Sequence, residues 1–215
     1  MTDGNDVRIL TVSATYGANG SIIAPRLAER LGLPFADRLL PAVDVAERAR
    51  ASEHLSDAER DQTAKTGLLN RLAYVTGGLG MPVPTPIDVG EGVREQVEAS
   101  IQQLVEGPGV VLLGRAGSVV LADHPRAYHV RLDGPEARRI AHAVAIEHID
   151  EKTARQRLTE TDRARSRYVN RLYGRDISDA AMYHLVVDTT VLNDDDSVAV
   201  IAEAAQAFWT RRPTA

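Results

Sequence analysis

The residues near the start of the chain that are best suited to chemistry form the segment Tyr16-Gly17-Ala18-Asn19-Gly20-Ser21. The segment follows the apolar stretch Arg8–Ser13 and precedes a pattern of apolar residues typical of a helix. Glycines let backbone amides turn toward a bound anion, and the start of a helix adds partial positive charge. The segment therefore predicts a phosphate-binding loop, although an ordinary turn between a strand and a helix has a similar composition.

The loop departs from the phosphate-binding pattern G-x-x-x-x-G-K-[ST] in a specific way. Ala14 and Asn19 stand where the two glycines are expected, and Gly20 stands where the lysine is expected. Ser21 keeps the hydroxyl that can reach magnesium. The backbone cradle can therefore be retained, whereas the point charge beside the phosphates must come from an arginine elsewhere in the chain.

A second group of functional side chains is the cluster Asp162, Arg163, Arg165 and Arg167. On a helix, Asp162 and Arg165 share one stripe and the other two arginines share the next. Planar guanidinium groups bind phosphate oxygens in a bidentate way, and a closing lid excludes water. The cluster predicts an arginine-rich lid that acts in catalysis, with a solvated helix face carrying ion pairs as the alternative.

Three more polar residues follow predicted strands. Asp37 and Arg38 come after a short strand at 33–36, and Arg115 comes after the fully apolar strand Val110–Leu113. Ligands of parallel α/β sheets bind at the carboxyl ends of the strands. We expect these three side chains to lie near a bound substrate.

The elements that must position these residues alternate between strands and helices. Besides the strands already named, residues 128–132 and 185–187 read as strands, and helices are expected at 93–105, from 135, from 151 and at the carboxyl end. Such alternation predicts a parallel sheet with helices on both faces. We expect a single domain over 1–215, with a core of 1–38 and 106–215, a helical and loop insertion at 39–105, and a lid at about 150–180. Residues 77–92, rich in glycine and proline, are expected to lack regular structure.

Composition narrows the classes of function. The chain of 215 residues has no cysteine, which excludes disulfides, zinc–thiolate sites and cysteine nucleophiles. Its formal net charge of −5 argues against nucleic-acid binding, and no apolar run is long enough to predict a membrane span. The six histidines show no metal-ligand spacing, and Asp194 to Asp196 read as the start of the last helix. We expect a cytoplasmic protein with a small-molecule substrate and leave homo-oligomerisation open.

Three blocks of sequence together resemble the cytidylate kinase-like family, a branch of the P-loop nucleoside monophosphate kinases. They are ILTVSATYGANGSIIAPRLAERLGLPFADR (9–38), VVLLGRAGSVVLADHPRAYHVRLDGPEARR (110–139) and TETDRARSRYVNRLYGRDISDAAMYHLVVDTTVL (159–192). The resemblance implies a three-layer P-loop kinase-like α/β fold with a helical insertion and an arginine-rich lid. It also implies transfer of a phosphoryl group from ATP, with Mg²⁺, to a nucleoside monophosphate such as CMP or dCMP.

The resemblance also assigns roles to residues. It places Tyr16 to Ser21 against ATP with Ser21 near Mg²⁺, and it implies that Asp37, Arg38 and Arg115 bind the acceptor and that the cluster at 162–167 forms the lid. Cytidylate kinases carry G-S-G-K in the loop and an aspartate after the second-block arginine, where this chain has Gly17-Ala18-Asn19-Gly20 and Ala116. Two alternatives therefore remain: a nucleotide-binding module without turnover, and a kinase for a small molecule other than a nucleotide.

Overall fold

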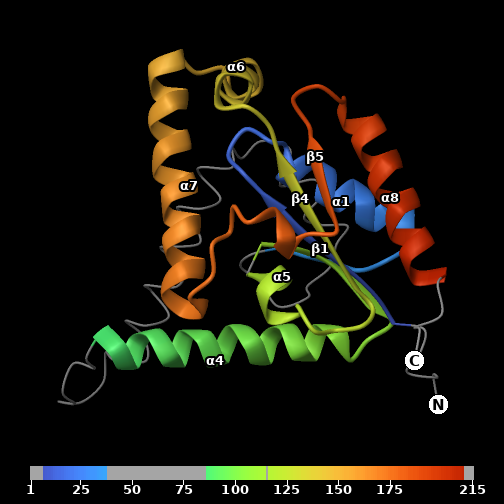
Figure 1. The fold of residues 1–215 in the computed structure, drawn as a ribbon. Coiled ribbons are helices and arrows are strands. Elements are labelled where there is room, and N and C mark those ends of the chain that lie inside the picture. Colours follow the sequence, from blue (N-terminus) through green and yellow to red (C-terminus); the bar gives the residue numbers. More distant parts are fainter. Residues whose placement is uncertain (1–6, 38–85, 115, 211–215) are drawn as a thin grey trace.

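Five parallel strands form one sheet in the order β2-β3-β1-β4-β5 (Figure 1). The computed structural model describes residues 7–37, 86–114 and 116–210. The strands are β1 (Arg8–Ala14), β2 (Phe35–Ala36), β3 (Gly109–Leu113), β4 (Ala127–Asp133) and β5 (Leu185–Asp188). Because every pairing is parallel, the carboxyl ends of all five strands meet at one edge. The predicted three-layer α/β architecture is confirmed.

One face of the sheet is covered by α1 (Gly20–Leu31) and α8 (Asp194–Thr210). The apolar residues Ile23, Leu27 and Leu31 recur every four positions and are buried in the largest core cluster. Gly32 then adopts a left-handed φ of 63° and ends α1. The loop that precedes α1 is thus held between a buried strand and a buried helix.

The other face carries α4 (Pro86–Val105) and the short helix α5 (Gly117–Val120). Ile101 and Val105 of α4 pack on the sheet in a second core cluster. The expected start of α4 at residue 93 is wrong, because the helix already begins at Pro86, where the proline ring presets a helical φ. Residues 86–92 are therefore helical, whereas 38–85, the rest of the predicted insertion, lie outside the described residues.

Two helices lie at the carboxyl edge of the sheet, α6 (Glu136–Glu147) and α7 (Glu151–Tyr173), and a 3-10 turn, η1 (Ala180–Met182), leads into β5 (Figure 1). Asp150 caps α7 by accepting a hydrogen bond of 2.9 Å from the amide of Thr153. Within the described ranges, no helix combines the length and apolar character needed to cross a bilayer.

The two faces of β1 and β4 differ in chemistry because side chains alternate along a strand. Leu10 and Val130 belong to the core under α1 and α8. On the opposite face, Thr11 and His129 meet in a hydrogen bond of 2.7 Å. The face toward α4 and α5 is therefore partly polar.

Candidate functional site

The loop between β1 and α1 is built around two left-handed residues. Gly17 has a φ of 76°, and an added Cβ there would collide with the backbone carbonyl of Arg139. Asn19, with a φ of 53°, directly precedes α1. Asparagine tolerates this conformation better than most residues, which explains how it can replace glycine here. The loop thus turns sharply enough to aim several amides in one direction.

Four amides of the loop are available to a ligand. The amide of Ala18 bonds the carbonyl of Thr15 at 3.2 Å. In contrast, the amides of Gly17, Asn19, Gly20 and Ser21 donate no hydrogen bond within the described part of the chain. Consecutive unpaired amides at a helix start bind phosphate oxygens. The loop therefore offers four backbone donors to a ligand.

The base of the loop is fastened to α6 and α7 by an ion pair. Arg139, only 8% exposed, donates hydrogen bonds to the carbonyl of Tyr16 at 2.9 Å and to Asp162 at 2.7 Å. The other oxygen of Asp162 accepts a hydrogen bond of 2.8 Å from the amide of Tyr16. The predicted lid residue Asp162 therefore orients the loop.

Three further side chains hold the tip of the loop. His142 donates through Nδ1 to the carbonyl of Gly17 at 3.0 Å, and Thr189 donates to the carbonyl of Ala18 at 3.0 Å. Asp194 accepts a hydrogen bond of 2.9 Å from the side-chain amide of Asn19. Neither these contacts nor the role of Arg139 was predicted from the sequence. Asp194 was predicted only to start the last helix, which it also does.

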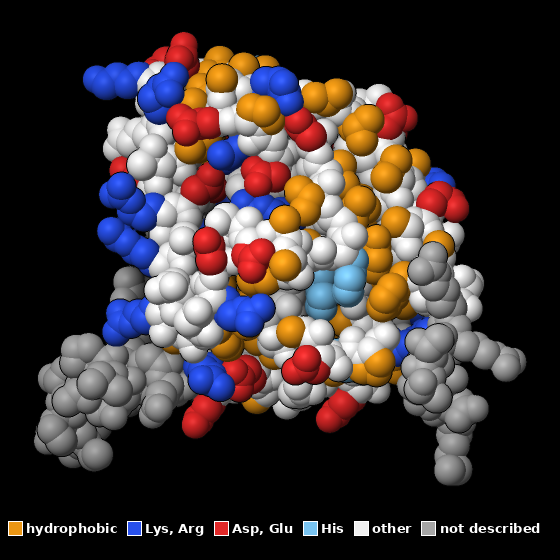
Figure 2. All heavy atoms as spheres, viewed as in Figure 1, with side chains coloured by type: hydrophobic (Ala, Val, Ile, Leu, Met, Phe, Trp, Pro, Cys, Tyr) orange, Lys and Arg blue, Asp and Glu red, His pale blue; other side chains and the backbone are white. Residues whose placement is uncertain are grey.

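Among the predicted lid arginines, Arg165 reaches the loop. Its Nη1 donates a hydrogen bond of 2.8 Å to the carbonyl of Ala14, where β1 ends, and lies 3.8 Å from Asp162. Arg163 and Arg167 are exposed on α7, where Figure 2 shows a row of Lys and Arg side chains along one edge of the molecule. The structure therefore brings one guanidinium to the loop and leaves two in solvent.

Asp37 is the one predicted acceptor residue that can be located, since Arg38 and Arg115 lie outside the described residues. It is half-buried and follows β2, the edge strand beside β3. It lies on the same edge of the sheet as the loop, because β2 and β1 both run parallel to β3.

The described residues fit Mg²⁺ only as an ion that is bound mainly by the phosphates of a ligand and contacted by one hydroxyl of the loop. In the described segments, no group of three histidine, aspartate or glutamate side chains could hold a metal ion. Asp133, at the end of β4, is already occupied by Thr15, Gly134 and Arg131. Burial raises the pKa of Asp133, but these hydrogen bonds and the charge of Arg131 outweigh burial and lower it. The half-buried Ser21 remains as the hydroxyl that could contact Mg²⁺ bound to phosphates.

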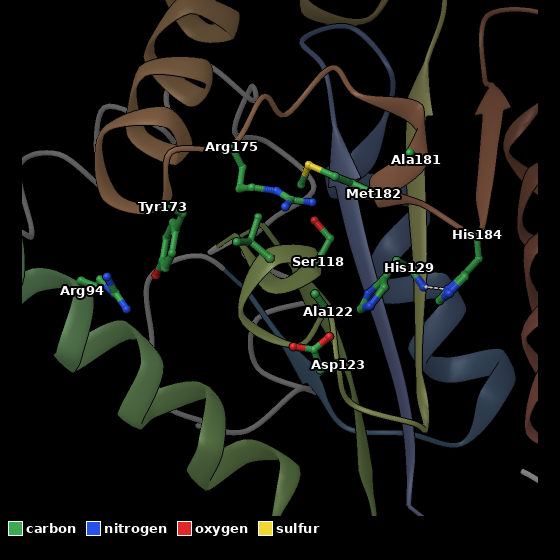
Figure 3. A pocket seen from close by; sticks show the side chains of 11 residues that line it. Arg94, Ser118, Ala122, Asp123, His129, Tyr173, Arg175, Ala181, Met182 and His184 are labelled. Atoms are coloured by element: carbon green, nitrogen blue, oxygen red, sulfur yellow. Dashed lines mark hydrogen bonds between the residues drawn. The ribbon is translucent and has the colours of Figure 1, made fainter. Parts of the chain in front are cut away.

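A pocket of about 440 Å³ lies on the face of the sheet that carries α4 and α5 (Figure 3). Its size is that of a small-molecule site. The end of α7 and the segment leading to β5 line one side of it. Its lining residues are Arg94, Ser118, Val119, Ala122, Asp123, His129, Tyr173, Arg175, Ala181, Met182 and His184. None of them was predicted from the sequence as a site residue.

Two stacked histidines form one wall of this pocket. The ring centroids of His129 and His184 are 5.0 Å apart, and the amide of His129 donates to Nδ1 of His184 at 2.9 Å. Burial, followed by the charge of His184, lowers the pKa of His129 to about 4. Burial also lowers the pKa of His184. The pair is therefore neutral at pH 7.

Comparison with known proteins identifies the family. The model of the cytidylate kinase-like family matches residues 9–191. A cytidylate kinase from Methanopyrus kandleri is 25% identical over 213 residues, covering 94% of this chain and 95% of the relative. The chain belongs to the cytidylate kinase-like family.

Solved structures share the fold. An uncharacterized protein from Eubacterium ventriosum superimposes with a TM-score of 0.63 at 17% identity, covering 93% of this chain and 99% of the other. A shikimate kinase from Acinetobacter baumannii gives a TM-score of 0.47 at 16% identity, with 96% and 97% covered. The chain has a parallel α/β fold with helices on both faces of the sheet, as the sequence predicted, and shares it with the Eubacterium ventriosum protein.

Proposed function

We propose that this member of the cytidylate kinase-like family is a cytoplasmic phosphotransferase that moves the γ-phosphoryl group of ATP to a nucleoside monophosphate, CMP or dCMP. The observation that carries the proposal is Arg165, whose guanidinium binds the carbonyl of Ala14 at the base of a loop with four unpaired amides. A cation at this place supplies the charge that the missing lysine would otherwise provide. Kinase activity is also what the family suggests.

The loop would hold the phosphates of ATP. The amides of Gly17, Asn19, Gly20 and Ser21 would donate to phosphate oxygens, and the Ser21 hydroxyl would contact Mg²⁺. When bound, Mg²⁺ neutralises part of the phosphate charge. Arg165 would stabilise the negative charge of the transferring group, and Asp162 would keep Arg165 in place.

The acceptor would occupy the pocket beside α5. A phosphate oxygen of a nucleoside monophosphate is an anion at neutral pH, so it needs no general base from the protein. Catalysis would then consist of holding the two phosphates in line and stabilising charge. Asp37 at the end of β2 would lie near the acceptor, and so would Arg38 and Arg115, which the family resemblance assigns to it.

A nucleotide-binding module without turnover is the second candidate, and one specific contact favours it. A Cβ added to Gly20 would lie 2.5 Å from Cβ of Ala14. The loop therefore has no room for the usual lysine in its present form, and Ala116 replaces the aspartate of cytidylate kinases. Such a module would bind nucleotide through the same amides and release no ADP.

The experiment that separates the candidates titrates the protein with ATP, CMP, dCMP and the other monophosphates in the presence of Mg²⁺. Thermal stability reports binding, and ADP release is then measured for each compound that binds. A monophosphate that raises the Tm and triggers ADP release supports the kinase. Stabilisation by nucleotides without ADP release with any monophosphate supports the binding module. ADP release that requires a non-nucleotide acceptor would show that the protein is a kinase for another class of small molecule.

A further inference from the structure

The pocket on the α4 and α5 face carries opposite charges at its two ends. Figure 3 shows Arg175 at the upper end and Asp123 at the lower end, near the end of α5. Both side chains are exposed, and neither makes an ion pair or hydrogen bond with another described residue through its charged group. The third charged residue of the lining, Arg94, already pairs with Glu98 at 2.7 Å and lies over the ring of Tyr173.

The cationic end combines two donors. Figure 3 shows the guanidinium of Arg175 and the hydroxyl of Ser118 pointing toward each other across the pocket. Ser118 is only 8% exposed, and its hydroxyl makes no hydrogen bond among the described residues. A guanidinium opposite a hydroxyl is a suitable arrangement for the oxygens of a phosphomonoester. Ser118 belongs to α5, which follows the carboxyl end of β3.

The space between the two ends suits an uncharged planar ring. The neutral imidazoles of His129 and His184, the thioether of Met182 and the ring of Tyr173 line it. None of these groups carries a charge at pH 7 that would compete with the charged ends. The charged groups at the two ends of the pocket would therefore determine the position of a bound ring.

We propose that the pocket binds its acceptor in one orientation, with the phosphate between Arg175 and Ser118 and an exocyclic amino group on the carboxylate of Asp123. The proposal rests on the proposed function, because it takes the acceptor to be a nucleotide. Cytosine carries such an amino group, whereas uracil has a carbonyl at the same position that a carboxylate repels. Asp123 would then supply the base selectivity that Ala116 cannot provide.

The test measures binding by calorimetry without ATP, using CMP, UMP and cytidine as probes. Arg175→Ala should weaken CMP binding by about 10- to 100-fold and UMP binding by a similar factor, because one charge-assisted contact is lost. Cytidine, which has no phosphate, should bind both proteins equally. Lys152→Ala, which removes an exposed charge from the start of α7, is the matched control and should leave CMP binding unchanged. Equal CMP affinity in wild type and Arg175→Ala would overturn the phosphate assignment.

Asp123→Asn tests the other end. Wild type should bind CMP at least about 10-fold more tightly than UMP, because uracil leaves the carboxylate facing a carbonyl. An amide can turn its donor toward uracil, so the variant should reduce this ratio to near one. Glu106→Gln, a change at another exposed carboxylate, should keep the wild-type ratio. An unchanged ratio in Asp123→Asn would overturn the base assignment.

These outcomes are distinguishable from failure of the kinase proposal. Binding of CMP that depends on Arg175 and Asp123, without ADP release when ATP is added, would support the orientation and contradict the kinase. ADP release with an acceptor KM that neither substitution changes would support the kinase and overturn the orientation. Far-ultraviolet circular dichroism and Tm of each variant establish that it is folded.

Discussion

Gly20, at the start of α1, lies so close to Ala14, at the end of β1, that an added Cβ would be 2.5 Å from Cβ of Ala14. In the phosphate-binding pattern the position of Ala14 is a glycine and the position of Gly20 is a lysine. In this chain the glycine position has gained a methyl group at Ala14, and the lysine position has lost its side chain at Gly20. The absence of the lysine and the presence of Ala14 are two parts of one packing arrangement.

This arrangement predicts strong coupling between the two positions. Gly20→Ala should lower the free energy of unfolding by about 1–3 kcal/mol, because the new methyl group overpacks the contact. In the Ala14→Gly background the same substitution should cost much less. A double-mutant cycle by urea denaturation measures the coupling. Equal costs of Gly20→Ala in both backgrounds would show that the Cβ contact is unimportant.

Gly17 is expected to be the most demanding glycine of the loop. An alanine there would meet both a left-handed φ and the carbonyl of Arg139, whereas at Gly32 it would meet only the φ of 63°. Gly32→Ala should therefore cost about 1 kcal/mol. Gly17→Ala should cost clearly more and should also weaken nucleotide binding. Similar losses of unfolding free energy for the two variants would contradict this account of the loop.

Asp162 is predicted to orient the loop through charge. Asp162→Asn replaces one of the two accepting oxygens, which bind Arg139 and the amide of Tyr16, with an NH₂ group that can only donate. Because the site is partly exposed, we expect a loss of about 2–3 kcal/mol of unfolding free energy. Glu160→Gln, which changes an exposed carboxylate on the same helix, is the control and should cost little. Urea denaturation of both variants checks this, and equal stability of the two would argue against the ion pair.

The histidine pair predicts a loss of stability in mild acid. The pKa of His129 is about 4 in the folded protein, below its ordinary value of 6.5, so the unfolded chain binds a proton first as the pH falls. Stability should be complete above pH 6.5 and should decline toward pH 4, with about 2 kcal/mol lost at pH 5 from this residue. His129→Gln should show a correspondingly smaller difference in unfolding free energy between pH 7.5 and pH 5. An identical pH dependence in the variant would show that protonation of His129 does not cause the loss of stability in acid.

Local sequence patterns predicted the framework well. The apolar run that forms β3 and the four-residue repeat in α1 are each determined by residues close in the chain. The same holds for the pairing of Asp162 with Arg165, which lie three residues apart on one helix. Helix α4 was predicted too short, because glycines near its start concealed the helical stretch after Pro86.

The contacts that complete the site could not be predicted in this way. His142 and Asp194 meet the loop from residues more than 120 positions away, and only the packing of α6 and α8 brings them there. The pocket is likewise assembled from α4, α5, β4 and the segment after α7. No periodicity or spacing in a single sequence records such distant encounters.

The most direct test of the central claim is phosphoryl transfer itself. The protein is incubated with Mg²⁺, ATP labelled in the γ-phosphate and CMP or dCMP, and the labelled product is identified by chromatography. The account predicts label in CDP or dCDP, and a kcat reduced by about 100-fold or more in Arg165→Ala, because the charge at the transferring group is lost. A folded protein that binds both nucleotides and transfers no label would contradict the claim and leave a nucleotide-binding module.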